Sequence, residues 1–579
     1  MDTASIDCSE PARWSRDSKR GCLHAAAYLS SVSLLALTLL PQVARADNEC
    51  GTGTTVVCSP SGNPYANGIR YNSSSGQNLS FEPGVAVDTA NDGLYISNGT
   101  AGDIVINTSA GTVTTSGDYR YGINASNNAG GVTVTTGDVT ASGTWASGIS
   151  AWSANGPVVI DTTAGTVAGR GTGIYASGNG LTITTADVGS SDGFSHAINA
   201  ATYGTGNVLV DTTAGTVSTQ GESSFGIFVN DGSGSPSLTT RVVTGDISTA
   251  GPEGSSGIVI RSSGIVEVDT TAGTVSTQGV QSSGIAVVAG FGNDNDGPAA
   301  RSIDIRSGAI TTAGAESAGI HVYGQQSAVT IDTTAGAIET RGASSAGLLV
   351  GNAAGDVSIR AGRIATSGEA AYGIAVTSED EGVTGTYRTE VVATQPITVT
   401  GANAGGIAVR DVGSGGPVTV TAEANVTAQG QNAVGIAAGS FHAPVAVTVN
   451  SGATVMGGWS QSPDDLSTGA STSGASSMTR IGGGLPAAGI VLFSGAAEGA
   501  RLTNNGTIGA MNDRAVTMGF PCATRGRASG GGSSASFNMT PTAPGGKSWL
   551  GTFASAIMEA IVPSARAAAP PAERGCGDG

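Results

Sequence analysis

Apolar and polar residues alternate along this chain in short runs that recur at a nearly constant interval. In one run, Val266 and Val268 are predicted to point inward and Glu267 and Asp269 outward, before a glycine turn restarts the strand. Each repeat also carries a Gly or Ala followed by a larger apolar residue, which serves as its landmark. The sixteen landmarks are Ile69, Leu94, Ile123, Ile149, Ile174, Ile198, Ile227, Ile258, Ile285, Ile320, Leu348, Ile374, Ile407, Ile436, Ile490 and Val516.

Most intervals between landmarks are 24 to 31 residues. Such an interval suits one coil of three short strands and three turns, and it is too short and too poor in helix formers for a helical repeat. We therefore predict an all-β solenoid of about sixteen coils. The string Asp-Thr-Thr-Ala-Gly returns at every second landmark, so a pair of coils is the predicted unit. Its aspartates, interpreted as turn-forming residues, are Asp161, Asp211, Asp269 and Asp332.

The N-terminal segment differs from the repeat. Basic residues precede an apolar stretch at 25–40, and the triplet Ala44-Arg45-Ala46 follows it, which predicts a signal peptide over residues 1–46. Residues 47–68 are then expected to form an N-terminal cap, and residues 69–520 the solenoid.

The chain beyond the repeat, residues 521–579, is predicted to be a Gly/Ser/Pro-rich linker followed by a short apolar helix. That helix either docks on the last coil or crosses a pore, and docking is the simpler interpretation. The residues at helical spacing on its apolar face are Trp549, Leu550, Phe553, Ile557 and Ile561.

Composition narrows the class of partner and the compartment. The formal net charge is −18, and the chain has two lysines, Lys19 and Lys547, which argues against nucleic acid as a partner. Four cysteines follow the predicted signal peptide, and an even count in an exported chain predicts disulfides at the two ends of the solenoid. The predicted pairs are Cys50 with Cys58 and Cys522 with Cys576.

Residues 47–520, with their Gly-Ile and Asp-Thr-Thr-Ala-Gly units behind a signal peptide, resemble the passenger region of bacterial autotransporters. The resemblance implies a right-handed parallel β-helix, a Gram-negative host and display at the cell surface. Members of that family end in a membrane β-barrel, which needs at least roughly 80 residues, whereas 59 residues follow Phe520. We therefore expect a truncated autotransporter, a separate transporter, or retention in the periplasm.

Two longer intervals, of 35 and 33 residues, contain acidic insertions that are predicted to protrude from the same corner as binding loops. The first insertion begins like a calcium-binding loop, but Ile303 stands where that loop needs a bidentate Glu. We therefore predict no cofactor and keep calcium as the alternative. The candidate residues are Asp294, Asp296, Glu379, Asp380 and Glu381.

The string Gly189-Ser190-Ser191-Asp192-Gly193 matches the G-x-S-x-G motif of serine hydrolases, but its flanks are predicted strands rather than a strand and a helix. We therefore assign no catalytic or metal-binding residue. The leading hypothesis is a non-enzymatic, cell-surface or secreted adhesin-like protein that binds a host or cell-surface glycan or protein. The alternative is an extracellular polysaccharide lyase or glycoside hydrolase on the same fold.

Overall fold

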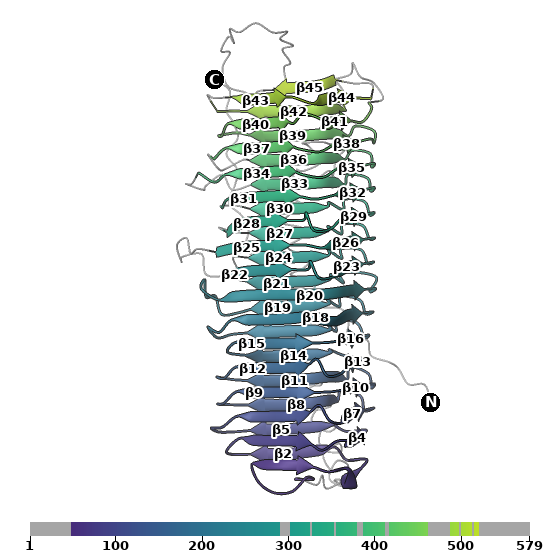
Figure 1. Ribbon diagram of the computed structural model, residues 1–579, viewed down its shortest axis with the longest axis vertical. Helices are drawn as coiled ribbons and strands as arrows, with labels where there is room; N and C mark the ends of the chain where they lie inside the picture. Colours follow the sequence, from purple (N-terminus) through teal and green to yellow (C-terminus); the bar gives the residue numbers. More distant parts are fainter. Residues whose placement is uncertain are drawn as a thin grey trace, which may run out of the picture. The chain divides into compact units, whose positions relative to one another are not determined.

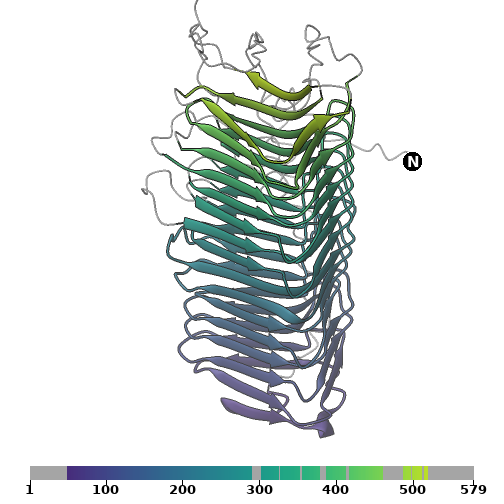
Figure 2. The ribbon, with the colours of Figure 1, turned by 45° about the horizontal axis from the view of Figure 1, so that its top comes forward.

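Each repeat folds into one coil of three strands joined by three corners. The computed structural model describes residues 48–289, 301–324, 327–352, 355–378, 386–411, 416–460, 487–496, 499–511 and 514–519. Within them every strand pairs in parallel with its counterparts in the neighbouring coils. Figures 1 and 2 show the coils stacked in sequence order. The all-β parallel β-solenoid predicted from the repeat is therefore confirmed.

The first face of the solenoid, which we call the landmark face, is a 16-stranded sheet. Its strands are β2 (Ile69–Ser73), β5 (Leu94–Asn98), β8 (Tyr121–Asn127), β11 (Ser147–Ser153), β14 (Ile174–Gly178), β17 (Ile198–Thr202), β19 (Ile227–Asp231), β21 (Ile258–Ser262), β24 (Ile285–Ala289), β27 (Ile320–Gly324), β30 (Leu348–Asn352), β33 (Tyr372–Ser378), β36 (Gly405–Asp411), β39 (Val434–Ser440), β42 (Ala488–Ser494) and β45 (Arg514–Gly519).

The second face follows the landmark face in each coil. Its strands are β1 (Thr55–Cys58), β3 (Gln77–Phe81), β6 (Ile104–Thr108), β9 (Val132–Thr136), β12 (Val158–Thr162), β15 (Leu181–Thr185), β18 (Val208–Thr219), β20 (Thr239–Thr249), β22 (Ile265–Asp269), β25 (Arg301–Arg306), β28 (Ser327–Asp332), β31 (Val357–Ala361), β34 (Thr389–Ala393), β37 (Val418–Ala422), β40 (Val445–Val449) and β43 (Ala500–Asn504).

The third face completes each coil. The long strands β18 and β20 run through both the second and the third face, which joins the two into one 29-stranded sheet. The remaining strands of the third face are β4 (Ala86–Thr89), β7 (Thr112–Thr115), β10 (Val139–Ala141), β13 (Val167–Gly169), β16 (Val188–Ser190), β23 (Thr274–Thr277), β26 (Ala309–Thr312), β29 (Ile338–Thr340), β32 (Ile364–Thr366), β35 (Ile397–Val399), β38 (Val426–Ala428), β41 (Thr454–Gly457) and β44 (Thr507–Ala510).

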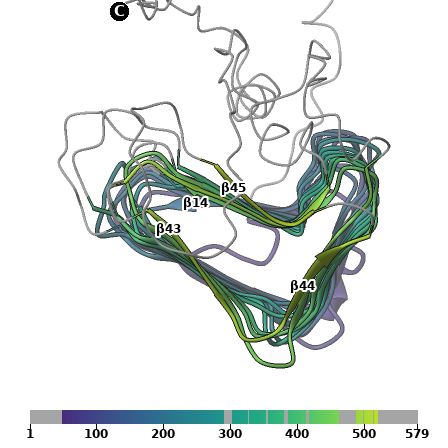
Figure 3. The same ribbon diagram turned by 90° about the horizontal axis from the view of Figure 1, so that it is seen from above.

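The landmark residues form one unbroken ladder. Ile69 pairs with Leu94, and the same pairing continues coil by coil until Ile490 pairs with Val516. The stack has about 14 turns, slightly fewer than the sixteen predicted, although all sixteen landmarks lie in the one sheet. Figure 3 shows the coils superposed when viewed along the stack.

The core fills the interior of the stack with the inward positions of the three faces. Val266 and Val268 are buried while Glu267 and Asp269 are partly exposed, which confirms the predicted alternation. Because each coil is covered above and below by its neighbours, even narrow layers of Ile, Val and Ala are removed from water.

The two-coil repeat has a physical cause in the corner after the second face. Asp161 accepts hydrogen bonds from the amide and hydroxyl of Thr163, as a turn-forming residue does, and its three counterparts do the same. In the alternate coils, Asp187 accepts bonds of 2.8 and 2.9 Å from the amide and hydroxyl of Thr216 in the next coil. Asp138 and Asp246 bind Thr166 and Thr274 in the same way.

This interlock explains why the repeated string alternates with a plainer unit. An aspartate in one coil pairs with a threonine in the next coil. Coils that carry the aspartate therefore alternate with coils that carry the threonine. Where the aspartate position holds an alanine, Ala309, the paired position in the next coil is also an alanine, Ala337.

The first coil is closed by a short N-terminal segment. Strand β1 pairs with β3, a 3-10 turn η1 (Pro60–Gly62) follows it, and a disulfide joins Cys50 to Cys58. The Tyr71 hydroxyl accepts from the Cys50 amide and donates to the Gly51 carbonyl, both at 3.0 Å. None of the described residues forms a helix of the length and hydrophobicity that crossing a membrane requires.

Candidate binding site

In ten coils, the corner between the third face and the landmark face holds a residue other than glycine in the left-handed region. Except at Trp145, its amide donates to a carbonyl in the next coil, as Tyr119 does to Thr144 at 2.8 Å and Phe194 to Glu222 at 2.7 Å. Residues other than glycine are uncommon there, so the stack must hold this conformation in place. The ten non-glycine residues, with φ of 52 to 57°, are Tyr119, Trp145, Phe194, Ser223, Gln281, Glu316, Ser344, Ala370, Asn403 and Asn432.

Three of the first residues in this corner column are aromatic and face solvent. Tyr119, Trp145 and Phe194 are 71%, 40% and 60% exposed. Tyr119 and Trp145 lie on adjacent coils, and Phe194 lies two coils beyond Trp145. Large apolar side chains so accessible contribute little to the core and form a surface suited to contact with a ligand.

The coil between Trp145 and Phe194 has a shortened corner. Four residues, 170–173, separate the third face from the landmark there, where seven residues, 142–148 and 191–197, do so in the coils on either side. This coil therefore has no residue to receive the Trp145 amide in the usual way.

Asp192 takes over that role from two coils away. Its Oδ2 accepts the Trp145 amide at 2.8 Å across the short coil, and its Oδ1 accepts from Arg170 Nε and Nη2 at 3.2 and 3.0 Å. A carboxylate here supplies the acceptor that the backbone of the short coil does not offer to this amide. The Asp192 side chain is 13% exposed, whereas that of Arg170 is 47% exposed and faces solvent.

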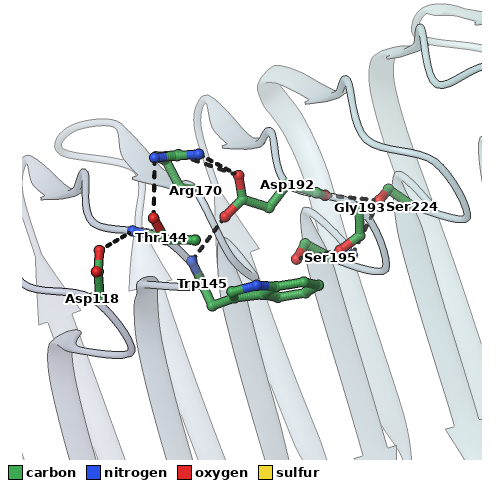
Figure 4. A network of polar contacts seen from close by, with 8 residues as sticks. All are labelled: Asp118, Thr144, Trp145, Arg170, Asp192, Gly193, Ser195 and Ser224. Carbon is green, nitrogen blue, oxygen red and sulfur yellow. Dashed lines mark hydrogen bonds and ion pairs between the residues drawn. The ribbon is translucent and has the colours of Figure 1, made fainter. Parts of the chain in front are cut away.

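Further polar contacts tie the neighbouring coils into the same arrangement. Arg170 Nη1 lies 3.5 Å from the Thr144 hydroxyl, and the Thr144 amide donates to Asp118 Oδ1 at 2.8 Å. Figure 4 shows the Trp145 indole extending from these contacts toward Gly193 and Ser195. The corner notch is the name we give to the site formed by Tyr119, Thr144, Trp145, Arg170, Asp192 and Phe194.

The corner notch offers an exposed aromatic surface beside an ion pair and a hydroxyl. Such a combination suits a ligand with one apolar face and several hydroxyl groups, because the rings contact the apolar face while Arg170 and Asp192 bind the polar edge. Asp192 also holds the guanidinium group of Arg170 in one orientation before a ligand binds, which lowers the entropic cost of binding the ligand.

The G-x-S-x-G string lies next to the corner notch but does not form a nucleophile elbow. It runs from strand β16 into a corner and then β17, and the Ser190 hydroxyl donates to the Ser195 carbonyl at 2.6 Å. His196 Nδ1 accepts the Phe225 amide at 3.0 Å, and its ring stacks on that of Phe225 at 4.7 Å. Burial lowers the pKa of His196 to about 4, so the ring is neutral at pH 7.

The predicted acidic binding loops lie outside the described residues. This applies to Asp294, Asp296, Glu379, Asp380 and Glu381, and also to Cys522 and Cys576. Their roles stay predictions. Ile303, the residue that argued against a calcium loop, is an inward residue of β25 and is 1% exposed.

The corner notch was not predicted from the sequence, although the repeat contains a signal for it. Tyr119, Trp145 and Phe194 each stand four residues before a landmark, and aligning the repeats on their landmarks would have placed them in one column. The same alignment shows the three-residue deletion at Arg170.

In comparisons with known proteins, no family model, curated protein or solved structure matches this chain. The fold and the corner notch therefore define the protein as a parallel β-solenoid with an aromatic surface site.

Proposed function

We propose that this chain is an exported, adhesin-like β-solenoid that binds a glycan at the surface of a cell through the corner notch, without catalysing a reaction. The observation that carries the proposal is the column of exposed aromatic residues at Tyr119, Trp145 and Phe194. Export is supported by the signal-peptide pattern at residues 1–46, and display at the cell surface by the resemblance to autotransporter passengers.

A glycan fits the chemistry of the corner notch better than a nucleic acid or an acidic ligand. The net charge of −18 repels polyanions, whereas a neutral sugar ring presents the apolar face and hydroxyl edge that the site can contact. The solenoid would then act as a rigid rod that carries the site away from its attachment point.

The test is binding of the purified chain to a panel of polysaccharides and cell-surface glycans. Trp145→Asn removes the indole while keeping a residue that tolerates the left-handed conformation, and we expect at least a tenfold loss of affinity for the glycan that the parent binds. Trp459→Ala is the matched control, because Trp459 is also 40% exposed but lies at the other end of the stack.

Equal affinity of the Trp145→Asn variant and the parent would contradict the assignment of the site. New reducing ends in the same mixtures would instead support the polysaccharide lyase or hydrolase alternative.

A further inference from the structure

The exposed aromatic residues of the corner notch form a strip that runs along the stack. Strands β8, β11, β14 and β17 pair in succession, and Tyr119, Trp145 and Phe194 precede the first, second and fourth of them. Three steps of about 4.8 Å separate the first coil from the last, so the strip is about 14 Å long. A strip of this length and direction suits an extended ligand better than a compact one.

The third of these coils supplies polar groups in place of an aromatic ring. Its corner, residues 170–173, is described in full and contains no left-handed residue. Arg170 lies there instead, with its guanidinium half exposed and bonded to Asp192. Figure 4 shows the Trp145 indole reaching across this coil toward Gly193. The strip is therefore continuous over four coils, with a polar group beside its middle.

The charges beside the strip are balanced within the chain. Arg120 lies 3.9 Å from Asp92 and Arg170 lies 3.0 Å from Asp192, so each of these cations already has a carboxylate partner. Asp118, whose carboxylate accepts a backbone amide, adds a further negative charge. Acidic groups on a ligand would be repelled here, whereas the exposed donors of Arg170 suit hydroxyl groups.

We propose that the glycan of the corner notch is a linear, uncharged, β-1,4-linked chain that lies parallel to the stack axis, with one sugar unit on each of the four coils from Tyr119 to Phe194. This inference rests on the function proposed above and adds the class and the orientation of the ligand.

The linkage follows from the repeat of the solenoid. In a β-1,4-linked chain of glucose or mannose both bonds between rings are equatorial, so the chain is extended and each unit advances by about the 4.8 Å that separates two coils. The rings then stay in register with the coils. Their apolar faces contact Tyr119, Trp145 and Phe194, and the hydroxyl groups of the third unit accept from Arg170.

The first test is the dependence of affinity on ligand length, measured by calorimetry with the purified full chain. The probes are oligomers of β-1,4-linked glucose, N-acetylglucosamine and mannose, each with two to six sugar units. We expect at least one series to bind, with an affinity that rises at least tenfold from two to four units and less than twofold from four to six. Oxidation of the primary hydroxyl groups of the bound oligomer to carboxylates should lower its affinity at least tenfold.

The second test removes the far end of the strip. Phe194→Asn keeps a residue that tolerates the left-handed conformation. It should weaken binding of the four-unit oligomer at least fivefold and leave the two-unit oligomer unchanged, because Tyr119 and Trp145 still hold the shorter ligand. Tyr203→Ala is the matched control and should bind both like the parent, since Tyr203 lies at the other end of β17 and is 66% exposed, against 60% for Phe194.

The outcomes separate this inference from the function on which it rests. Equal affinity for two and four units, or an equal effect of Phe194→Asn on both, would overturn the alignment along the stack. Binding to a polysaccharide of the earlier panel without binding to any of the three linear series would also overturn it, while the proposed function would stand. Failure of the parent to bind any glycan of that panel would overturn the proposed function itself.

Discussion

The amide of Ser255 donates a hydrogen bond of 2.8 Å to the hydroxyl of Ser282 in the next coil. The same bond joins each neighbouring pair in a line of six fully buried serines, which acts as a polar spine beside the apolar core. Each hydroxyl also donates to a backbone carbonyl, so the spine satisfies both its donors and its acceptors. The six residues are Ser195, Ser224, Ser255, Ser282, Ser317 and Ser345.

Replacing one serine of the spine should destabilise the solenoid locally. Ser282→Ala removes the acceptor of the buried Ser255 amide, and leaving such a group unpaired costs about 1–3 kcal/mol. We expect a lower midpoint of urea unfolding and faster hydrogen exchange at the Ser255 amide. Ser276→Ala, at a partly exposed position of β23, is the control and should change neither.

The Asp–Thr interlock between coils should appear as a coupling energy. Asp187→Ala breaks both hydrogen bonds between these residues, and Thr216→Ala breaks the one from the hydroxyl, so the double variant should lose less stability than the sum of the two single variants. The expected coupling is about 0.5–1.5 kcal/mol by a double-mutant cycle in urea. Strict additivity would show that the interlock is a by-product of the register rather than one of its causes.

The course of the chain could be predicted from the sequence because a solenoid repeats one local rule. Period-two alternation assigns Val266 and Val268 to the interior, and each landmark has to stack on the next to remain buried. The paired Asp138 and Thr166 could not be predicted as partners, because 28 residues separate them and only the register of the coils brings them together.

The site was harder to predict because it depends on a departure from the repeat. A three-residue deletion beside Arg170 changes what Asp192 and Trp145 can reach, and no rule about residue types signals that change. The acidic insertions instead predicted binding loops at Asp294 and Glu379, and both residues lie outside the described residues.

Burial of a neutral histidine should make stability depend on pH. The pKa of His196 falls from 6.5 to about 4 on folding, because burial disfavours the charged ring. The unfolded chain then binds more protons, so the contribution of His196 is complete above pH 6.5 and is lost as the pH falls toward 4, by up to about 3 kcal/mol. Urea unfolding at pH 7.5 and 4.5 should show a smaller difference for His196→Gln than for the parent. Parallel pH profiles of the two proteins would contradict a buried neutral imidazole.

Loss of the Asp192 carboxylate should weaken glycan binding through Trp145. Asp192 accepts the Trp145 amide and holds Arg170, so Asp192→Ala should free both and leave an amide without its acceptor, at a cost of about 1 kcal/mol in stability. We expect several-fold weaker binding, with Asp192→Asn intermediate because its amide oxygen retains one acceptor. Asp304→Ala, which breaks an exposed ion pair with Arg306 far from the corner notch, should bind like the parent. Equal binding by Asp192→Ala and Asp304→Ala would mean that the aromatic rings act without the orientation that Asp192 provides.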